Sequence, residues 1–190
     1  IATGSHATSL PGITIDEKRI VSSTGVLSLN KCPKKLVVIG AGYIGLELGT
    51  VWARLGAKVE VIEFLPRILP GMDDEIAKKF MAIAKKQGLS FRLSAAVKQA
   101  KSSKAGVTLT VEPADGGKPE SISADIALVS VGRHPATDGL GLEAAGVALT
   151  ERGRIAVDTR FETSLDDVYA IGDVIDGPML AHKAEEDAVA

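Results

Sequence analysis

Gly40-Ala41-Gly42-Tyr43-Ile44-Gly45 is a GxGxxG turn that directly follows the apolar run Leu36-Val37-Val38-Ile39. A helical pattern comes after the turn, and the next apolar strand ends at Glu63, eighteen positions after the last glycine. A GxGxxG match alone occurs in many glycine-rich turns, but this order of strand, turn, helix, strand and acid is typical of a dinucleotide-binding Rossmann unit. The stretch therefore predicts a bound dinucleotide. A tight structural turn without a ligand is the alternative interpretation.

Each glycine of the turn has its own predicted role. Gly40 permits the sharp bend out of the strand, Gly42 carries no side chain that would block a pyrophosphate, and Gly45 lets the helix pack close to the sheet. The unpaired backbone amides at the start of the helix, together with its dipole, favour a bound anion. The other turn residues predicted to contact the cofactor are Ala41, Tyr43 and Ile44.

The acid at the end of the second strand predicts which dinucleotide binds. The Glu63 carboxylate can accept hydrogen bonds from both hydroxyls of an adenosine ribose. A 2′-phosphate would meet a like charge there, so Glu63 predicts NAD over NADP. Arg67 lies close in the sequence and is the residue type that NADP sites offer. A solvated carboxylate at a strand end is the alternative interpretation of Glu63.

The composition is typical of an ordinary soluble globular protein of one to two domains. Of the 190 residues, 45% are hydrophobic and 24% are charged, and the formal net charge is −2. No long basic run is present, so neither nucleic acid nor an anionic membrane surface is indicated as a partner. The longest uncharged apolar stretch, residues 36–46, is interrupted by glycines and is too short to span a bilayer.

Metal and thiol chemistry are not indicated by the residue spacing. Cys32 is the only cysteine, which excludes an internal disulfide and a CxxC pair, and we expect it to be inert beside Pro33. His6, His134 and His182 lie far apart in the sequence, and none has metal-ligand spacing. We therefore expect no metal and, since no Ser/His/Asp motif occurs, no hydrolase.

Helical and strand patterns continue along the chain. A helix is predicted from about Tyr43 to Leu55, and a second helix, capped by Asp73 or Asp74, precedes a strand at 89–93. The expected buried face of the second helix consists of Ile76, Phe80, Ile83 and Gln87. Alternating segments at 107–112 and 121–123 predict an antiparallel meander, and residues 125–131 are typical of a buried central strand.

Four separated motifs together resemble the signature of the flavoprotein disulfide reductases. They are Ala2-Thr3-Gly4-Ser5, the 40–45 turn with Glu47, Val131-Gly132-Arg133, and Tyr169-Ala170-Ile171-Gly172-Asp173. The closing segment, residues 177–185, narrows the resemblance to members that oxidise dihydrolipoamide in 2-oxoacid dehydrogenase complexes. In that family an NAD domain is inserted within an FAD domain. The resemblance therefore implies an α/β fold with a Rossmann-like NAD-binding domain and meander at 31–134, flanked by pieces of an FAD-binding domain at 1–30 and 135–190.

The resemblance also implies a set of FAD contacts. The Thr3-Gly4 turn, with Ala2 before it, is expected to pass the FAD, and Asp173 to accept a hydrogen bond from a flavin-side hydroxyl. A turn or strand-end role is the alternative for Asp173. A helix beginning near Met179 is expected to aim its N-terminal amides at the flavin ring, where its dipole would stabilise negative charge. The residues implied at this helix start are Met179, Leu180, Ala181 and His182, the last through its backbone.

Three further positions match NAD contacts of the family. Glu47 corresponds to a residue that faces the nicotinamide and flavin edge in relatives, where it pairs with a lysine that this chain does not contain. A surface carboxylate stabilised by the helix dipole is the alternative. Val97 and Gly132 match positions where the family's backbone touches NAD. Arg133 is expected at the surface or at an interface.

The chain departs from the family in its redox residues. Family members pass electrons from dihydrolipoamide through a cysteine pair to FAD and on to NAD, and they use a His/Glu pair from a partner subunit. This chain has neither pair, so we interpret it as an internal fragment that is inactive alone. The implied partners are NAD(H), FAD held with the rest of the parent, a second copy, and a 2-oxoacid dehydrogenase complex, in the mitochondrial matrix or a bacterial cytoplasm. The alternatives are a transhydrogenase-like NAD-linked flavoprotein without redox cysteines and a non-catalytic nucleotide-binding module.

Overall fold

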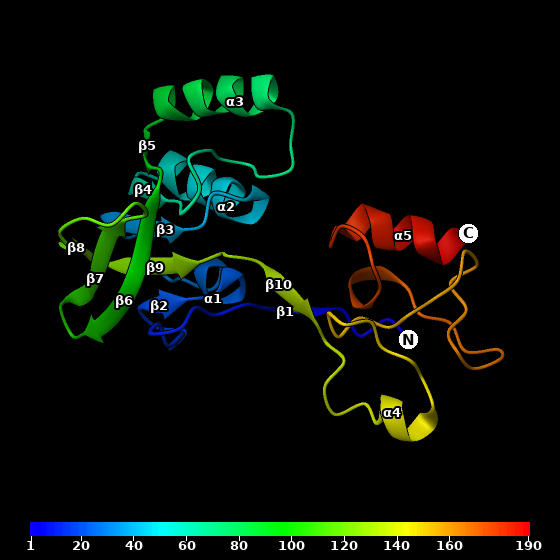
Figure 1. Cartoon of the computed structure of the whole chain (residues 1–190). Coiled ribbons are helices and arrows are strands. Elements are labelled where there is room, and N and C mark those ends of the chain that lie inside the picture. Colours follow the sequence, from blue (N-terminus) through cyan, green and yellow to red (C-terminus); the bar gives the residue numbers. More distant parts are fainter. The chain divides into compact units, whose positions relative to one another are not determined.

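The computed structural model describes all residues from 1 to 190, and their contacts divide into two compact units. The larger unit is Thr8–Gly132, and the smaller unit combines Ile1–Ala7 with Arg133–Ala190. The α-helices and β-strands of both units are labelled in Figure 1.

A five-stranded parallel sheet forms the centre of the larger unit (Figure 1). In spatial order its strands are β2 (Ile20–Val21), β9 (Ile126–Val129), β3 (Lys35–Ile39), β4 (Lys58–Ile62) and β5 (Leu89–Arg92). The sequence-predicted strands are confirmed, although β9 ends at Val129 rather than at residue 131. Because β4 and β9 lie on opposite sides of β3, the strand order reverses at β3. Doubly wound sheets bind ligands outside the carboxyl ends of the strands at such a point.

Three helices belong to this unit. They are α1 (Ser23–Leu27), α2 (Tyr43–Arg54) and α3 (Asp74–Lys86). Asp73 caps α3, because its carboxylate accepts hydrogen bonds from the backbone N–H groups of Glu75 and Ile76 at 2.9 and 3.1 Å. Acidic residues in the first turn of α3 and lysines in the last turn complement the helix dipole.

The predicted buried face of α3 was partly wrong. Ile76 and Ile83 are about half exposed, whereas Ala77 and Ala84 are buried and Phe80 packs partly against the core. The observed buried face of α3 keeps helical spacing, but it is rotated about the helix axis, relative to the predicted face, toward Ala77 and Ala84. Small side chains at the centre of the contact let the helix backbone approach its neighbours closely, and the larger isoleucines are left at the solvent side.

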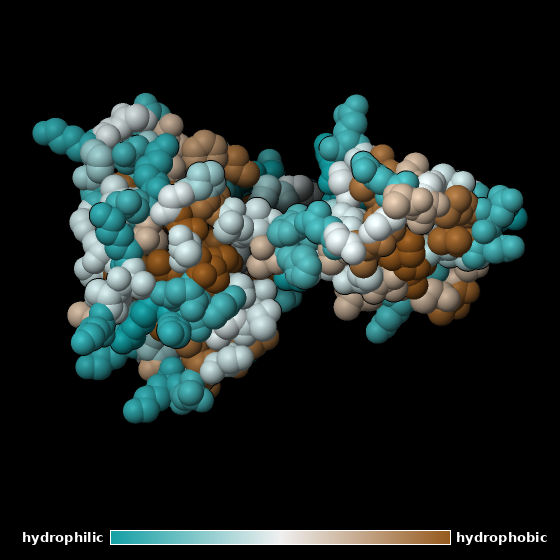
Figure 2. Space-filling view, turned by 90° about the horizontal axis from the view of Figure 1, so that it is seen from below, coloured by the Kyte–Doolittle hydropathy of each residue, from teal (hydrophilic) through white to brown (hydrophobic).

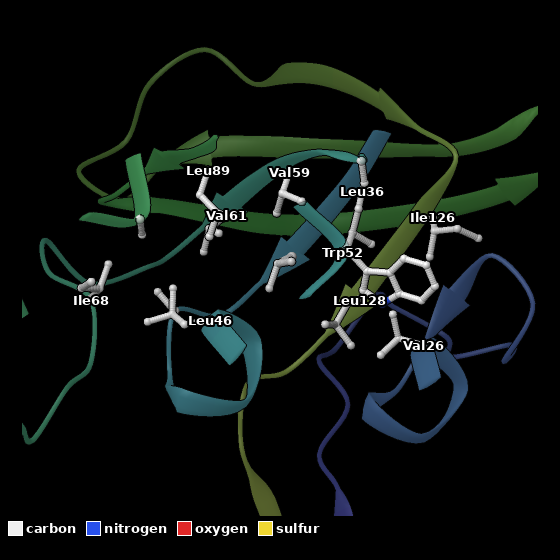
Figure 3. Close-up of a cluster of buried hydrophobic side chains, with 14 of the residues drawn as sticks. Val26, Leu36, Leu46, Trp52, Val59, Val61, Ile68, Leu89, Ile126 and Leu128 are labelled. Atoms are coloured by element: carbon white, nitrogen blue, oxygen red, sulfur yellow. The ribbon is translucent and has the colours of Figure 1, made fainter. Parts of the chain in front are cut away.

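Strand alternation gives the sheet two hydrophobic faces. Leu36 and Val38 of β3 pack in one cluster with side chains of α1, α2 and α3. Their neighbours Val37 and Ile39 pack in a second cluster with the antiparallel strands on the other side. Figure 3 shows the helix-side cluster, whose labelled members are Val26, Leu36, Leu46, Trp52, Val59, Val61, Ile68, Leu89, Ile126 and Leu128.

An antiparallel meander supplies the second face, as predicted. It consists of β6 (Ala95–Ser103), β7 (Gly106–Pro113) and β8 (Glu120–Ala124), in that spatial order. Its register shifts between Val97 and Gln99, where a bulge interrupts the pairing of β6 with β7. The inward side chains of β7, Val107, Leu109 and Val111, are almost fully buried in the second cluster.

The compact units differ from the expected division at two places, since Arg133 and His134 fall in the smaller unit and a longer segment near the N-terminus falls in the larger one. Residues 8–30 pack with the larger unit rather than with the segment before them. β2 pairs in parallel with β9, where Ile20 lies opposite Ala127 and Val21 opposite Leu128. Ile13 also packs in the second hydrophobic cluster. These contacts join the segment to the larger unit because β2 extends the same sheet.

The smaller unit contains little regular secondary structure. Its elements are the antiparallel pair β1 (Ser5–Ala7) and β10 (Arg133–Pro135), the helices α4 (Leu142–Ala145) and α5 (Ala181–Val189), and the 3-10 turn η1 (Gly172–Val174). Its core is one cluster of buried residues: Leu142, Val147, Ile155, Ala170, Val174 and Ile175. Turns and loops carry most of the chain between these elements.

Hydrophobic side chains also reach the surface (Figure 2). Val51 on α2, Leu55 at its C-terminal cap and Phe64 in the loop after β4 are about half exposed or more. None of the helices has both the length and the apolar character needed to cross a membrane.

Candidate functional site

The glycine turn lies at the carboxyl end of β3, between its two neighbouring strands. The Gly40 N–H donates to the Ile62 carbonyl at the end of β4 at 2.8 Å. On the other side the Ser130 N–H donates to the Ile39 carbonyl at 2.9 Å. These bonds fix the turn at the point where the strand order reverses, which is the ligand-binding position of such sheets.

The three glycines of the turn meet different steric limits. Gly40 has a φ of +103°, and a Cβ there would lie 2.4 Å from the Ser130 carbonyl oxygen. A Cβ on Gly45 would lie 2.3 Å from the Gly40 carbonyl oxygen, because the helix packs against the turn. A Cβ on Gly42 would meet no protein atom within 4 Å. The packing of the fold thus explains why Gly40 and Gly45 have no side chain. At Gly42 no protein atom fills the space in front of the backbone, so a ligand can approach it.

The start of α2 offers an anion the groups that it needs. Gly42 is the N-cap residue, no side chain caps the helix, and its first turn contains no acidic residue. Backbone N–H groups and the positive end of the helix dipole are therefore not neutralised by a carboxylate. Glu47 lies further along α2 and is exposed. Its role near a nicotinamide stays a prediction.

Glu63 is buried beside the turn and is held there by two backbone groups. Its Oε2 accepts from the Ala41 N–H at 2.7 Å, and its Oε1 accepts from the Leu65 N–H at 2.9 Å. An ionised carboxylate offers about four acceptor positions, so further hydrogen bonds from ligand hydroxyls can be accommodated. The bond to Ala41 links the acid directly to the glycine turn, which the sequence alone did not indicate.

The Arg67 side chain bonds to residues of its own loop and of the helix that follows. Its guanidinium donates to the carbonyl of Met72 at 2.6 Å and forms an ion pair with Asp74 at the start of α3. Further, longer hydrogen bonds run to the carbonyls of Ile68 and Leu69. To bind a 2′-phosphate of NADP, the Arg67 guanidinium would have to break these contacts. The structure therefore weakens the sequence argument that Arg67 could select NADP.

Two further predicted positions lie on segments that border the turn. β6 begins beside Glu63, since the Ala95 N–H donates to the Glu63 carbonyl at 2.9 Å, and Val97 follows two residues later with its side chain in the core. Gly132 follows β9 by three residues, with a φ of +134°, and is exposed. Thus the turn residues 40–45, Glu63, Val97 and Gly132 all belong to the larger unit. Their contact with NAD stays a prediction.

Glu47 also lies in the larger unit, and the predicted FAD-contact residues all belong to the smaller unit. Ala2 and Thr3 are exposed, and the Thr3 hydroxyl donates to the Ala136 carbonyl at 2.8 Å. Gly4 has a φ of +77°, and its carbonyl accepts from the Ala136 N–H at 2.9 Å. These bonds fasten the N-terminal segment to the chain that follows β10.

A polar network connects this segment to Asp173. The Ser5 hydroxyl donates to the Asp173 carboxylate and accepts from the Arg133 guanidinium at 2.6 Å, and Arg133 also donates to the Ser5 carbonyl at 2.6 Å. Arg133 is half-buried, and its bonds to Ser5 hold this network together. It is therefore more than a surface residue, although it was expected at the surface or at an interface. Ser5 and Arg133 stand in the recognised motifs, but their spacing of 128 residues concealed the contact.

The helix after Met179 begins at Ala181, slightly later than predicted. Leu180 is the N-cap residue, no side chain caps the helix, and no acid lies in its first turn. His182 is exposed. Near the other end, Asp187 accepts from the Gly172 N–H at 2.9 Å and from Lys183 at 2.6 Å, which joins α5 to η1. Contact of Met179, Leu180, Ala181 and His182 with FAD stays a prediction.

Together, the sheet order, the glycine turn and the buried acid define a Rossmann-type dinucleotide-binding α/β protein. The comparison with family models then gives the family: the chain belongs to the pyridine nucleotide-disulphide oxidoreductases, whose model matches residues 1–188. The predicted family and fold class are confirmed, and the cofactors of this family are FAD and NAD(H).

Individual relatives agree with this family. Dihydrolipoyl dehydrogenase 1, mitochondrial, of Arabidopsis thaliana is 60% identical over 190 residues, which are 100% of this chain and 38% of that protein. Leghemoglobin reductase of Glycine max is 59% identical over 100% of this chain and 36% of its own length. Among solved structures, the HOCl-induced flavoprotein disulfide reductase RclA from Escherichia coli matches with a TM-score of 0.86 and 33% identity, over 97% of this chain and 41% of that one. The chain thus spans well under half the length of these relatives.

Proposed function

We propose that this chain is the NAD(H)-binding portion of a flavin-dependent oxidoreductase that oxidises dihydrolipoamide to lipoamide with NAD. The observation that carries the proposal is the open, uncapped start of α2 at Gly42 beside the buried carboxylate of Glu63. The 60% identity to a dihydrolipoyl dehydrogenase supports the choice of substrate. Catalysis would need redox cysteines from outside the chain, since Cys32 is its only cysteine.

The residues present fit an NAD dinucleotide. The α2 amides would hold the pyrophosphate, and Gly42 would let it approach the backbone. Glu63 would accept the ribose hydroxyls with the acceptor capacity that Ala41 and Leu65 leave. When bound, NAD supplies the ring carbon that accepts a hydride. Glu47, Val97 and Gly132 would contact the cofactor on the segments that border this turn.

NAD should be preferred over NADP because of charge. A 2′-phosphate beside Glu63, a residue that is only 9% exposed, would place like charges close together. Arg67, a nearby cation in the sequence that could offset this repulsion, is already bonded to Met72 and Asp74.

We further infer that the smaller unit contributes to an FAD site. The Asp173 carboxylate accepts a hydrogen bond from the Ser5 hydroxyl, which leaves other lone pairs of its two oxygens able to accept from a cofactor hydroxyl. The uncapped start of α5, at Met179, Leu180, Ala181 and His182, would turn backbone N–H groups toward the flavin and stabilise negative charge on it. Ala2, Thr3 and Gly4 would pass the same cofactor. In this proposal residues 31–134 serve NAD, and 1–30 and 135–190 belong to the FAD domain, although residues 8–30 pack with the larger unit.

The same reasoning extends to partners and compartment. We propose that the parent is a homodimer associated with a 2-oxoacid dehydrogenase complex. The mitochondrial names of the relatives support a place in the mitochondrial matrix, and a bacterial parent would act in the cytoplasm.

Calorimetric titration with NADH and NADPH tests the cofactor assignment. We expect NADH to bind at least about tenfold more tightly, and Glu63→Gln to weaken NADH binding by about tenfold, since hydrogen bonds to charged groups contribute about 1.5–3 kcal/mol. Glu75→Gln removes an equal charge from an exposed site on α3 and serves as the matched control. Tighter NADPH binding, or an unchanged Glu63→Gln variant, would contradict the assignment.

The substrate is tested separately with the full-length protein. Dihydrolipoamide should reduce NAD to NADH, which is followed by absorbance. NADH binding without lipoamide turnover by a full-length protein would contradict the substrate but leave the nucleotide site intact. The flanking sequence distinguishes the alternatives, because an upstream CxxxxC pair is needed for lipoamide chemistry and not for a transhydrogenase or a binding module.

A further inference from the structure

Two histidines that are far apart in the sequence face each other across a strand pair. His6 of β1 lies directly opposite His134 of β10 in the antiparallel register, and both are exposed. Figure 1 shows the two strands, β1 and β10, side by side. Their ring centroids are 5.7 Å apart, and the ring planes are tilted by 50°. Both strands belong to the smaller unit, so the pair is defined within one compact body.

We propose that His6 and His134 form a two-histidine chelate for a late first-row divalent metal ion, with Cu(II) bound most tightly. Imidazole is a preferred ligand of Cu, Zn and Ni. The affinity of a given site for divalent first-row metals rises from Mn(II) to a maximum at Cu(II) and falls again at Zn(II). The site depends neither on NAD nor on FAD.

The geometry fits a shared ion. A metal–nitrogen bond of about 2.0–2.1 Å places an imidazole centre about 3.2 Å from the metal. The centres of two rings then lie about 4.5 Å apart at neighbouring positions of a tetragonal Cu(II) ion and about 5 Å apart on a tetrahedral Zn²⁺ ion. The observed separation of 5.7 Å is longer than both values, and χ rotations of the two exposed rings would bring their centres closer. The backbone pairing of β1 and β10 fixes the spacing, so little conformational entropy is lost on binding.

The ring nitrogens are also available. Neither imidazole makes a hydrogen bond or an ion pair within the chain, and the ring contact is the interaction that they share. The next residues on the same face within this unit, Gly4 and Ala136, are small and leave room for water ligands. No third His, Cys, Asp or Glu completes the set, so solvent would occupy the remaining positions.

Nearby charge does not oppose the ion at this face. Alternation places Ser5 and Arg133 on the opposite face of the strand pair, where the Arg133 guanidinium is bonded to Ser5. A metal on the histidine face would cross-link the N-terminal segment to the strand that begins at Arg133. By linkage, binding to the folded pair stabilises the smaller unit.

Titration with Cu²⁺, followed by electron paramagnetic resonance, tests this site. We expect one ion per chain with two nitrogen ligands. His6→Gln and His134→Gln should each lower affinity at least about tenfold, because even groups that only orient a ligand are worth about 10- to 100-fold. A spectrum with a single nitrogen, or unchanged affinity in either variant, would overturn the proposal.

Two control variants separate this site from other metal-binding groups. His182→Gln removes the third histidine, and Cys32→Ser removes the exposed thiol. We expect the two-nitrogen spectrum to persist in both. Its loss in either control would assign the copper elsewhere and overturn the proposal. Added Cu²⁺ should also slow hydrogen exchange in β1 and β10 in the wild type but not in His6→Gln, and equal slowing in both would contradict the cross-link.

Discussion

The two units of this chain are stabilised in different ways. The larger unit buries hydrophobic side chains on both faces of a parallel sheet, and each face has its own cluster. The smaller unit has a single cluster of six buried residues and relies on polar links such as Ser5–Asp173 and Asp187–Gly172. The proposed NAD site therefore stands on a large buried core, while the proposed FAD contacts depend on hydrogen-bonded loops.

The largest expected effect comes from the core of the larger unit. Leu128→Ala should lower its free energy of unfolding by about 2–5 kcal/mol, because the leucine is fully buried. Trp52, the only tryptophan, lies in the same cluster and reports this transition by fluorescence in denaturant. Leu142→Ala in the smaller unit is the matched control and should leave the Trp52 transition unchanged. Equal shifts would show that the units unfold as one cooperative body.

An intermediate effect is expected at the buried ion pair of the smaller unit. Lys183–Asp187 and Lys79–Glu75 are both i,i+4 pairs at 2.6 Å, but the Asp187 side chain is 8% exposed and that of Glu75 is 73% exposed. Burial opposes ionisation of Asp187, yet the hydrogen bonds from Lys183 and Gly172 keep its pKa below the usual value. Asp187→Asn should therefore weaken the link between α5 and η1.

Hydrogen exchange measures this difference. Protection of α5 should fall about tenfold or more in Asp187→Asn, since charged hydrogen bonds are worth about 1.5–3 kcal/mol. Glu75→Gln should change protection of α3 less than about threefold, as expected for an exposed pair. Comparable losses in the two helices would remove the distinction between the units.

The smallest effect concerns acid stability of the larger unit. Although burial opposes it, hydrogen bonds from the N–H groups of Arg19, Ile20 and Lys18 lower the pKa of Asp16 to about 2. A lowered pKa adds stability above the unfolded value of about 4, which is lost as the pH falls toward 2. Asp16→Asn should lower the free energy of unfolding by about 1 kcal/mol or less at neutral pH. It should also reduce the loss of stability between about pH 4 and about pH 2. An unchanged pH profile of the Trp52 transition would contradict the assignment.

Local features of the sequence predicted the structure best. The Gly40–Gly45 turn, the Asp73 cap and the alternating meander strands depend on neighbouring residues, and each was found where the pattern placed it. The buried face of α3 was harder, because packing favoured Ala77 and Ala84 over the larger isoleucines.

Contacts between distant segments could not be derived from local patterns. β2 has two residues and pairs with β9 more than one hundred positions later, so residues 8–30 gave no local sign of their sheet. Likewise, the Arg133–Ser5 contact and the His6–His134 pair arise from the register of β1 with β10. The bond from Ala41 to Glu63 joins two predicted site residues, but only the fold shows it.

Titration of Gly42→Ala with NADH tests the central claim most directly. Gly42 has a φ of −74° and open space in front of it, so a methyl group there should shift the Trp52 unfolding transition by less than about 1 kcal/mol. If the pyrophosphate binds at the start of α2, that methyl group should lower NADH affinity at least about tenfold by displacing a charge-assisted hydrogen bond. Unchanged NADH affinity in a normally folded variant would show that the dinucleotide binds elsewhere.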